Sequence, residues 1–263
     1  MHMQLQSYSA TQPNTGAAAA ALAGDSLTIQ NAKKTVKIIA AWAVSQVAGF
    51  VQVAFPSAHD TTRGLRMNTQ AVALTHILPI GQVIEVEPQE LLAITIAGSN
   101  TAGDVEQVCM LQMLDLPGVS GRYIGYGELK RRTEKLTSIQ ASIAVTAGPA
   151  YTGEELITSE SDLLKANRDY AIIGATFRTG QAANSNPAVL TIRGPDIGNV
   201  RIGIPVSADT LLTSEYFALL SRATGEDCIP VINSGNRAAT FIGGACDENG
   251  VDIEASLLLA LLK

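Results

Sequence analysis

Residues 35–44 read TVKIIAAWAV, and residues 170–177 read YAIIGATF. Both stretches are rich in β-branched and small apolar residues, a composition typical of buried β-strands. Upstream of each stretch lies a tripeptide that begins with Asp and ends with Leu, namely DSL at 25–27 and DLL at 162–164. This recurrence predicts that the chain contains two copies of one β-rich unit, joined in tandem.

Further stretches correspond in the same order along the chain. The pairs are QVIEVEP (82–88) with CIPVINS (228–234), LLAITIAG (91–98) with AATFIGG (238–244), and CMLQML (109–114) with SLLLALL (256–262). In this comparison Trp42 falls opposite Phe177, so we expect these two aromatics to anchor equivalent cores. A repeat of roughly 100 residues has the size of one β-sandwich domain and is too long for a solenoid repeat.

The strand content of each copy fits a jelly roll. Each copy offers about seven or eight candidate strands, and a jelly roll packs eight strands into two sheets face to face. We therefore predict an all-β fold of two tandem jelly-roll β-sandwiches (a double jelly roll) with short helices in the connections. The best helix candidate is Thr213–Ala223, where Ser/Thr capping residues precede apolar residues at helical spacing.

Changes in composition predict the domain boundaries. Residues 1–24 are polar and then alanine-rich, so we expect an N-terminal arm that orders on docking, or a short helix. The first jelly roll is predicted over residues 25–116 and the second over residues 162–263. Residues 117–161 begin with a glycine- and tyrosine-rich stretch and are predicted to form a connector, with room for the first strand of the second domain.

The charge content indicates a protein that hides much of its surface. Charged residues make up 16% of the chain and hydrophobic residues 46%, against roughly 25% charged residues in an average soluble domain. The formal net charge is −6, whereas proteins that wrap nucleic acid usually carry a basic face. We therefore expect large contacts with partner chains and no direct sequence-specific binding of nucleic acid.

One dense basic cluster stands out from this acidic background. It consists of Lys130, Arg131, Arg132 and Lys135. A run of charge is usually a solvated surface segment, which is the interpretation that we favour. The alternative is a surface that faces a membrane or a partner.

The sequence offers little for catalysis or metal binding. The only histidines are His2, His59 and His76, and no close His-x-His pair occurs. Metal sites usually gather three or four ligands at characteristic spacings. The patterns of an α/β-hydrolase nucleophile, a Walker loop and a dinucleotide-binding loop are also absent from the sequence. We therefore expect no enzyme activity, no metal and no cofactor.

The cysteines suit a reducing compartment. There are three of them, Cys109, Cys228 and Cys246, and no CxxC spacing occurs. An odd number without that spacing predicts neither a disulfide framework nor a zinc site. Because the alanine run Ala17–Ala21 follows no Lys or Arg, we also expect no secretion signal and synthesis in a cytoplasm.

Tandem jelly rolls in one short chain, an N-terminal arm and no catalytic motif resemble the double jelly-roll major capsid proteins. These belong to tailless icosahedral viruses of the lineage that includes membrane-containing phages and adenovirus-type viruses. The resemblance covers residues 25–262 and rests on architecture and the repeat, since no sequence motif carries it. Many members have a short helix between two late strands of each roll, and Thr213–Ala223 falls at that place. The matching stretch of the first copy, Asn68–Ile80, is less clearly helical.

The resemblance implies a structural role in a virion. Its members form homotrimers whose six jelly rolls make a pseudo-hexagonal capsomer, and the capsomers assemble an icosahedral shell. The implied partners are further copies of the chain, other virion proteins such as a vertex protein, and an internal lipid membrane. The implied location is the capsid shell, after synthesis in the host cytoplasm.

A sugar- or receptor-binding β-sandwich module, such as a spike or a lectin-like domain, is the alternative. Such modules stack sugars on exposed aromatic rings, and aromatic residues make up 5% of this chain. Tyr123, Tyr126 and Tyr151 form the one cluster in the sequence that could serve as a stacking platform. Packing within the connector is the simpler interpretation of these tyrosines.

Overall fold

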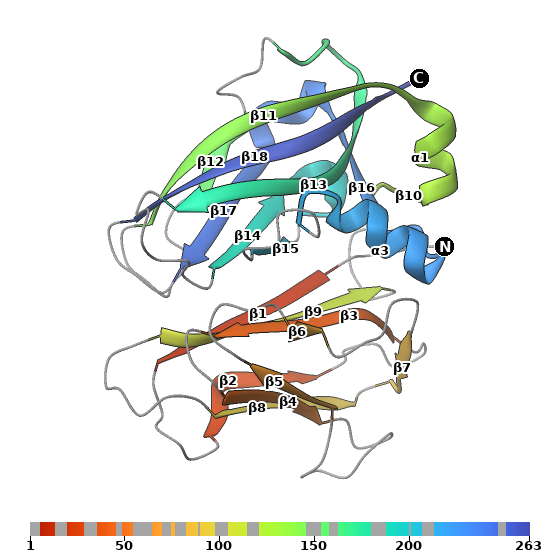
Figure 1. Ribbon diagram of the computed structural model, residues 1–263. Coiled ribbons are helices and arrows are strands. Elements are labelled where there is room, and N and C mark those ends of the chain that lie inside the picture. The colour runs from red at the N-terminus through yellow and green to blue at the C-terminus, as the bar shows by residue number, and fades with distance from the viewer. Residues whose placement is uncertain are drawn as a thin grey trace.

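The computed structural model describes residues 6–13, 20–28, 36–45, 49–54, 65–69, 75–76, 83–88, 90–97, 105–114, 121–145, 154–157, 163–179, 188–199, 201–206, 213–246 and 251–263. Strands dominate these residues, and the few helices are short. Figure 1 shows two β-sandwiches, one above the other, with the N-terminal half of the chain below and the C-terminal half above. The fold is therefore all-β and jelly-roll-like.

The first half contains two sheets. The sheet nearer to the second half has the order β1-β9-β3-β6, and β7 also pairs with β3 (Figure 1). The sheet farther away has the order β2-β8-β4-β5. The bounds are β1 Gln6–Pro13, β2 Ala20–Thr28, β3 Val36–Ser45, β4 Gly49–Ala54, β5 Leu65–Thr69, β6 Thr75–His76, β7 Ile84–Val86, β8 Leu91–Ala97 and β9 Val105–Leu114.

The second half also contains two sheets, of order β10-β16-β13-β18-β11 and β12-β17-β14-β15. The bounds of the strands are β10 Tyr123–Ile124, β11 Thr133–Val145, β12 Glu154–Leu156, β13 Asp169–Thr179, β14 Ala188–Arg193, β15 Ile202–Val206, β16 Ile229–Asn233, β17 Phe241–Cys246 and β18 Val251–Leu262. The helices are α1 Tyr126–Arg132, η2 Pro195–Ile197, α3 Tyr216–Thr224 and η3 Ser234–Ala239.

The strand order of the first half recurs in the second. If β1 to β5 are matched with β11 to β15, and β7 to β9 with β16 to β18, β1-β9-β3 corresponds to β11-β18-β13, and β2-β8-β4-β5 to β12-β17-β14-β15. Among the described strands, β6 has no counterpart in this match. The pairs of both halves are antiparallel. The match of QVIEVEP with CIPVINS is confirmed, since β7 pairs with β3 as β16 pairs with β13.

The central strand pair carries the same irregularity in both halves. One residue of β3, Ile39, is skipped in the pairing with β9. One residue of β13, Ile173, is likewise skipped in the pairing with β18. A bulge of this kind bends a strand and is a specific feature of a fold, not a random defect. Its recurrence at one place in the two halves supports the predicted repeat.

These bulges correct the expected match of the two aromatics. When β3 and β13 are aligned on them, Trp42 corresponds to Thr176, and Phe177 corresponds to Ala43. The predicted match was based on aromatic character and is wrong by one residue, which in a strand means the opposite face. Phe177 is half-buried and packs against the core of the second sandwich. The structure describes only the backbone of Trp42, which pairs with Met110.

Two segments differ from their expected roles. The predicted arm, residues 1–24, contains β1 and the start of β2, and β1 pairs with β9 over its whole length. The predicted connector, residues 117–161, contains α1, β10, β11 and β12. Backbone hydrogen bonding to a neighbouring strand needs no apolar run, so composition alone missed β1. Residues 128–140, ELKRRTEKLTSIQ, are helical up to Arg132, and the remaining residues belong to β11.

The predicted helix Thr213–Ala223 is largely present as α3. The α-helix starts at Tyr216 and ends at Thr224, followed by Gly225 in the left-handed conformation (φ 75°). The Gly225 N–H donates to the carbonyl of Ser221, which satisfies one of the free carbonyls at the helix end. Tyr216 and Phe217 of this helix are buried. Asn68–Ile80 of the first copy lies partly outside the described residues.

The core of the second half extends into the first. Tyr170 and Phe217 are among the largest fully buried side chains. Ile39, the bulge residue of β3, is 2% exposed and belongs to the same apolar cluster. Nearby, the Lys37 ammonium lies 2.7 Å from the Glu226 carboxylate, just beyond α3. The two sandwiches are therefore joined by apolar packing and an ion pair.

A substitution at Gly174 tests the close packing of β13 against the backbone that precedes α3. A Cβ atom at this position would lie 2.3 Å from the carbonyl oxygen of Thr213 and 2.5 Å from that of Ser214. We expect Gly174→Ala to lower the free energy of unfolding by about 1–3 kcal/mol, because the backbone before α3 must shift. Urea denaturation monitored by circular dichroism measures this change.

Gly127→Ala is the matched control. Gly127 lies inside α1, and a Cβ atom there meets nothing within 4 Å. Alanine favours a helix interior by about 0.5–1 kcal/mol over glycine, so this variant should be unchanged or more stable. If Gly174→Ala were as stable as wild type, the close contact between β13 and the backbone before α3 would be wrong.

Candidate functional site

The predicted basic cluster lies at one end of the second sandwich, where α1 leads into β11. Lys130, Arg131 and Lys135 are exposed there. The fold adds two further bases, because the segment before β13 brings Lys165 and Arg168 to the same place. We call the surface formed by these five residues the basic end.

Glu134 joins the two parts of the basic end. Its carboxylate accepts hydrogen bonds from Lys165 Nζ at 2.9 Å and from Arg168 Nη2 at 3.1 Å. The hydrogen bond from Lys165, with a smaller contribution from Arg168, holds the pKa of the Glu134 carboxyl below its usual range. Sequence reasoning missed Lys165 and Arg168, because more than 30 positions separate them from Glu134 and no local pattern links them.

Arg132, the fourth member of the predicted cluster, has a structural role. Its guanidinium lies 2.7 Å from the Glu128 carboxylate and donates to the Lys263 carbonyl at 3.3 Å. The Lys263 N–H in turn donates to the Arg132 carbonyl at 2.8 Å. These bonds attach the end of α1 to the end of β18, so Arg132 is less suited than its neighbours to bind a partner.

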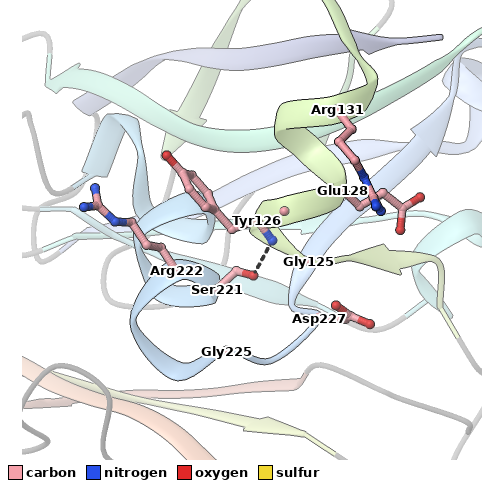
Figure 2. A pocket seen from close by; sticks show the side chains of 9 residues that line it. Gly125, Tyr126, Glu128, Arg131, Ser221, Arg222, Gly225 and Asp227 are labelled. Atoms are coloured by element: carbon pink, nitrogen blue, oxygen red, sulfur yellow. Dashed lines mark hydrogen bonds between the residues drawn. The ribbon is translucent and has the colours of Figure 1, made fainter.

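An open pocket of about 550 Å³ lies between α1 and α3, beside the basic end (Figure 2). Its lining residues are Gly125, Tyr126, Gly127, Glu128, Arg131, Ser221, Arg222, Gly225 and Asp227. Arg131 and Arg222 balance Glu128 and Asp227, so the lining has no excess of one charge. The Ser221 hydroxyl donates to the Glu226 carbonyl at 2.7 Å and accepts from the Tyr126 N–H at 2.9 Å. Through these two hydrogen bonds, the Ser221 hydroxyl holds the start of α1 against α3.

The tyrosines of the connector pack against protein. Tyr123 and Tyr126 are half-buried against the core of the second half, and the Tyr123 hydroxyl donates to the Ile197 carbonyl at 3.4 Å. The guanidinium of Arg222 lies 5.9 Å from the centre of the Tyr126 ring. Tyr151 lies outside the described residues. These two rings therefore offer little face for stacking a sugar.

A polar network closes the same end of the sandwich. The Arg122 guanidinium makes a two-pronged hydrogen bond with the Asp169 carboxylate, with one contact at 3.0 Å. Asn233 donates its amide to Asp169 at 2.8 Å and its backbone N–H to Asp196 at 2.9 Å, and Asn236 also donates to Asp196. The bond from Arg122 is the main cause that lowers the pKa of Asp169. The charged side chains of this network, Arg122, Asp169 and Asp196, are therefore all bonded to other residues of the same domain.

A second ion-pair cluster lies on the other sheet. Glu154 of β12 accepts hydrogen bonds from Arg193 of β14 at 3.3 Å and from Arg201 at 3.2 Å. Arg193 also lies over the Phe241 ring, 4.6 Å from its centre. The hydrogen bond from Arg193 is the largest cause that lowers the pKa of Glu154. The cluster therefore links the short β12 to β14 and to the residue before β15, across the intervening β17.

Nucleophile and metal chemistry find no support in the part of the chain that the structure describes. Burial raises the pKa of the Cys228 thiol to about 12, which keeps it protonated and unreactive at neutral pH. No group of three or more His, Cys, Asp or Glu side chains within the described ranges is arranged to hold a metal ion. Among those residues, no helix has both the length and the apolar character to cross a bilayer.

Comparisons with known proteins find likeness at the level of structure only. No family model and no curated protein matches the sequence. The chain resembles the STIV MCP with 8% identity over 99% of this chain and 97% of the other, at a TM-score of 0.23. It resembles the major capsid protein P2 from bacteriophage PM2 with 6% identity over 99% and 98%, at a TM-score of 0.26. An atomic structure of Sulfolobus Turreted Icosahedral Virus matches with 8% identity over 100% and 91%, at a TM-score of 0.20.

These matches are to viral capsid proteins.

The Glu154 cluster predicts a pH dependence of stability. The lowered pKa means that its stabilisation is present above the unfolded value, about 4.3, and is lost as the pH falls through the lower folded value. We expect Glu154→Gln to lower the free energy of unfolding by about 1 kcal/mol at neutral pH, through loss of charge-assisted hydrogen bonds. At an acidic pH, below the unfolded value of about 4.3, the difference from wild type should shrink, because the unfolded wild-type chain then takes up a proton that the folded ion pair resists.

Urea denaturation at the two pH values measures this difference. The exposed neighbour Glu155, replaced by Gln, controls for the loss of one charge from the same strand. If the difference in the free energy of unfolding between wild type and Glu154→Gln were the same at both pH values, the ion-pair explanation would be contradicted.

Proposed function

We propose that this chain is a structural capsid protein with a double jelly-roll fold, which trimerises into pseudo-hexagonal capsomers and assembles an icosahedral virion shell. The observation that carries the proposal is the repeated strand order together with the repeated bulge at Ile39 and Ile173. A duplicated sandwich inside one chain gives a single subunit two similar building blocks, which suits a shell made from many copies of one protein.

The repeat also supports a division of the chain into two domains. We propose to extend the first jelly roll from residues 25–116 to include β1 and β2, and the second from residues 162–263 to include β11 and β12. Both extensions follow from backbone pairing, since β1 pairs with β9 and β11 pairs with β18. The first strands of each half then have equivalent places in their sheets.

Surface chemistry supports a role in assembly and not in catalysis. The ion pairs described above are used to fix loops and helices, and Cys228 is held as an unreactive thiol. We propose no cofactor and no enzyme activity. The half-buried Tyr123 and Tyr126 disfavour the alternative of a sugar-binding module, because their rings are engaged by protein. Trp42 and Phe177 stay proposed anchors of the two cores.

The proposed partners follow from this role. They are further copies of the chain, other virion proteins such as a vertex protein, and an internal lipid membrane. The proposed location is the virion shell, reached after synthesis in the host cytoplasm. A net charge of −6 disfavours a shell that binds the genome directly. The basic end is the surface of the second sandwich that we consider best suited to anionic headgroups, because Lys130, Arg131 and Lys135 are exposed there.

The mass of the purified protein tests the assembly proposal. Light scattering coupled to size-exclusion chromatography should give a mass about three times the 27.5 kDa of one chain, and electron microscopy of concentrated samples should reveal closed particles. A monomer at every concentration, with measurable affinity on a glycan array, would favour the sugar-binding alternative and overturn the proposal.

Liposome binding tests the proposed role of the basic end. Replacing Lys130, Arg131 and Lys135 by Ser should remove most binding to vesicles with anionic lipids, since each base near such a surface contributes about 1 kcal/mol. Arg132 is left intact, because its bonds hold α1 to β18. The control variant keeps the charges (Lys130→Arg, Arg131→Lys, Lys135→Arg) and should bind as wild type does. Unchanged sedimentation of the Ser variant with vesicles would show that the basic end is only a solvated surface.

A further inference from the structure

β11 is a long strand at the edge of its sheet. It contains 13 residues, and among the described strands its ladder partner is β18, on one side. Its register with β18 is regular from Leu136 to Val145, with one irregularity near the start, between Thr133 and Lys135. Figure 1 shows β11 as a long curved strand at the edge of the upper sandwich. Among the described strands, its other side therefore presents a run of backbone donors and acceptors without a partner strand.

This edge lacks the devices by which proteins usually protect an exposed strand. Such edges commonly carry a central Lys or other charge, a proline, or a bulge in the middle. The stretch 137–145 reads TSIQASIAV and contains neither a charged residue nor a proline. Its β-branched residues favour an extended conformation. The sequence is therefore suited to pairing with a further strand.

The side chains of β11 alternate between the core and the solvent. Ile139 and Ile143 are buried in the sandwich, as the alternation of a strand requires. The residues of the opposite face are exposed, and they are Leu136, Ser138, Gln140, Ser142 and Ala144. Leu136 is 54% exposed, one of two large hydrophobic residues with that much exposure among the described residues. This face is flat and carries small or uncharged side chains.

The two ends of β11 carry opposite charge. The start of the strand lies at the basic end, beside Lys130 and Lys135. The far end lies beside the start of β18, where Ala144 faces Asp252 and Ser142 faces Glu254 in the register. Both of these acidic residues are exposed, but Glu254 also lies opposite Arg178 of β13 in the register, so Asp252 supplies the acidic charge at this end. An antiparallel neighbour of the same sequence would therefore place its basic start next to the acidic end of this chain, twice by symmetry.

We propose that β11 pairs antiparallel with β11 of a second copy of this chain, so that the two sheets become one continuous sheet across a two-fold axis. The uncharged centre supplies the backbone pairing, and the ends supply charge complementarity, which fixes the antiparallel orientation. This contact goes beyond the proposed capsid role and does not require it, because two copies suffice to form it.

Disulfide cross-linking tests the contact. Facing residues of paired antiparallel strands lie about 4.5–5.5 Å apart between Cα atoms, within the limit of about 7 Å for a disulfide. We would replace Ser138, Gln140 and Ser142 by Cys one at a time, and mix the variants in pairs to sample neighbouring registers. Oxidation by diamide should then give a covalent dimer of about twice 27.5 kDa on a denaturing gel.

Ser256→Cys is the matched control. Ser256 faces Gln140 in the register, but it lies on β18, one strand inside the edge. Two copies of this position would be roughly 14 Å apart, three strand spacings, and should not cross-link. Wild type controls for the native cysteines, and Ala166→Cys, exposed in a loop, controls for random collision. Cross-linking in none of the β11 variants, or equally in the controls, would overturn the proposal.

A charge swap tests the orientation. Asp252→Lys in the Gln140→Cys background should remove most of the cross-linked dimer, and so should Lys130→Glu combined with Lys135→Glu. The variant with all three reversals restores opposite charges at each end and should recover the dimer. If reversal has no effect while the dimer persists, the charge-directed orientation is wrong. Trimer mass and particle formation are measured separately, so failure here is distinguishable from failure of the capsid proposal.

Discussion

The backbone pairing of β18 with strands on both sides is the constraint on which the second sandwich depends. β13 and β11 flank it, and its inward residues, such as Leu257 and Leu259, are buried. A strand with no solvent on either edge must have its N–H and C=O groups bonded to its neighbours, because an unpaired buried group is costly. This requirement keeps β11 and β13 paired with β18, and the burial of alternate residues such as Leu257 and Leu259 selects the register.

The corresponding pair in the first half, β3 with β9, obeys the same constraint and has the same bulge. A bulge interrupts the strict alternation of side chains between the two faces of the sheet, so the side chain of the bulge residue can point in a different direction from those of its neighbours. In β3 this residue is Ile39, which packs into the core of the other half. The local irregularity of one strand therefore contributes to the attachment of the two sandwiches, together with the ion pair of Lys37 and Glu226.

Charge in this protein is used mainly to hold segments together. Arg122 with Asp169, Arg193 with Glu154, and Arg132 with Glu128 each connect different elements or turns. On the second sandwich, exposed Lys130, Arg131 and Lys135 lie at the basic end, exposed Asp252 lies near the far end of β11, and the centre of the β11 edge is uncharged. The internal ion pairs are fixed and the Cys228 thiol is unreactive. The ends of β11 are charged and its centre is uncharged. These features suit contacts with other subunits, in line with the proposed function.

The amino-acid sequence by itself determined the all-β class, the repeat, α3 to within a few residues, and the basic cluster, because local composition and periodicity are enough for these features. It did not reveal β1, since a polar strand is defined by the partner that it pairs with. It also misaligned Trp42 and Phe177, because only the register decides which face a side chain occupies. Lys165 and Arg168 joined the basic end through long-range packing around Glu134. Tertiary structure decides such features because residues far apart in the chain meet only when strands pair and sheets stack.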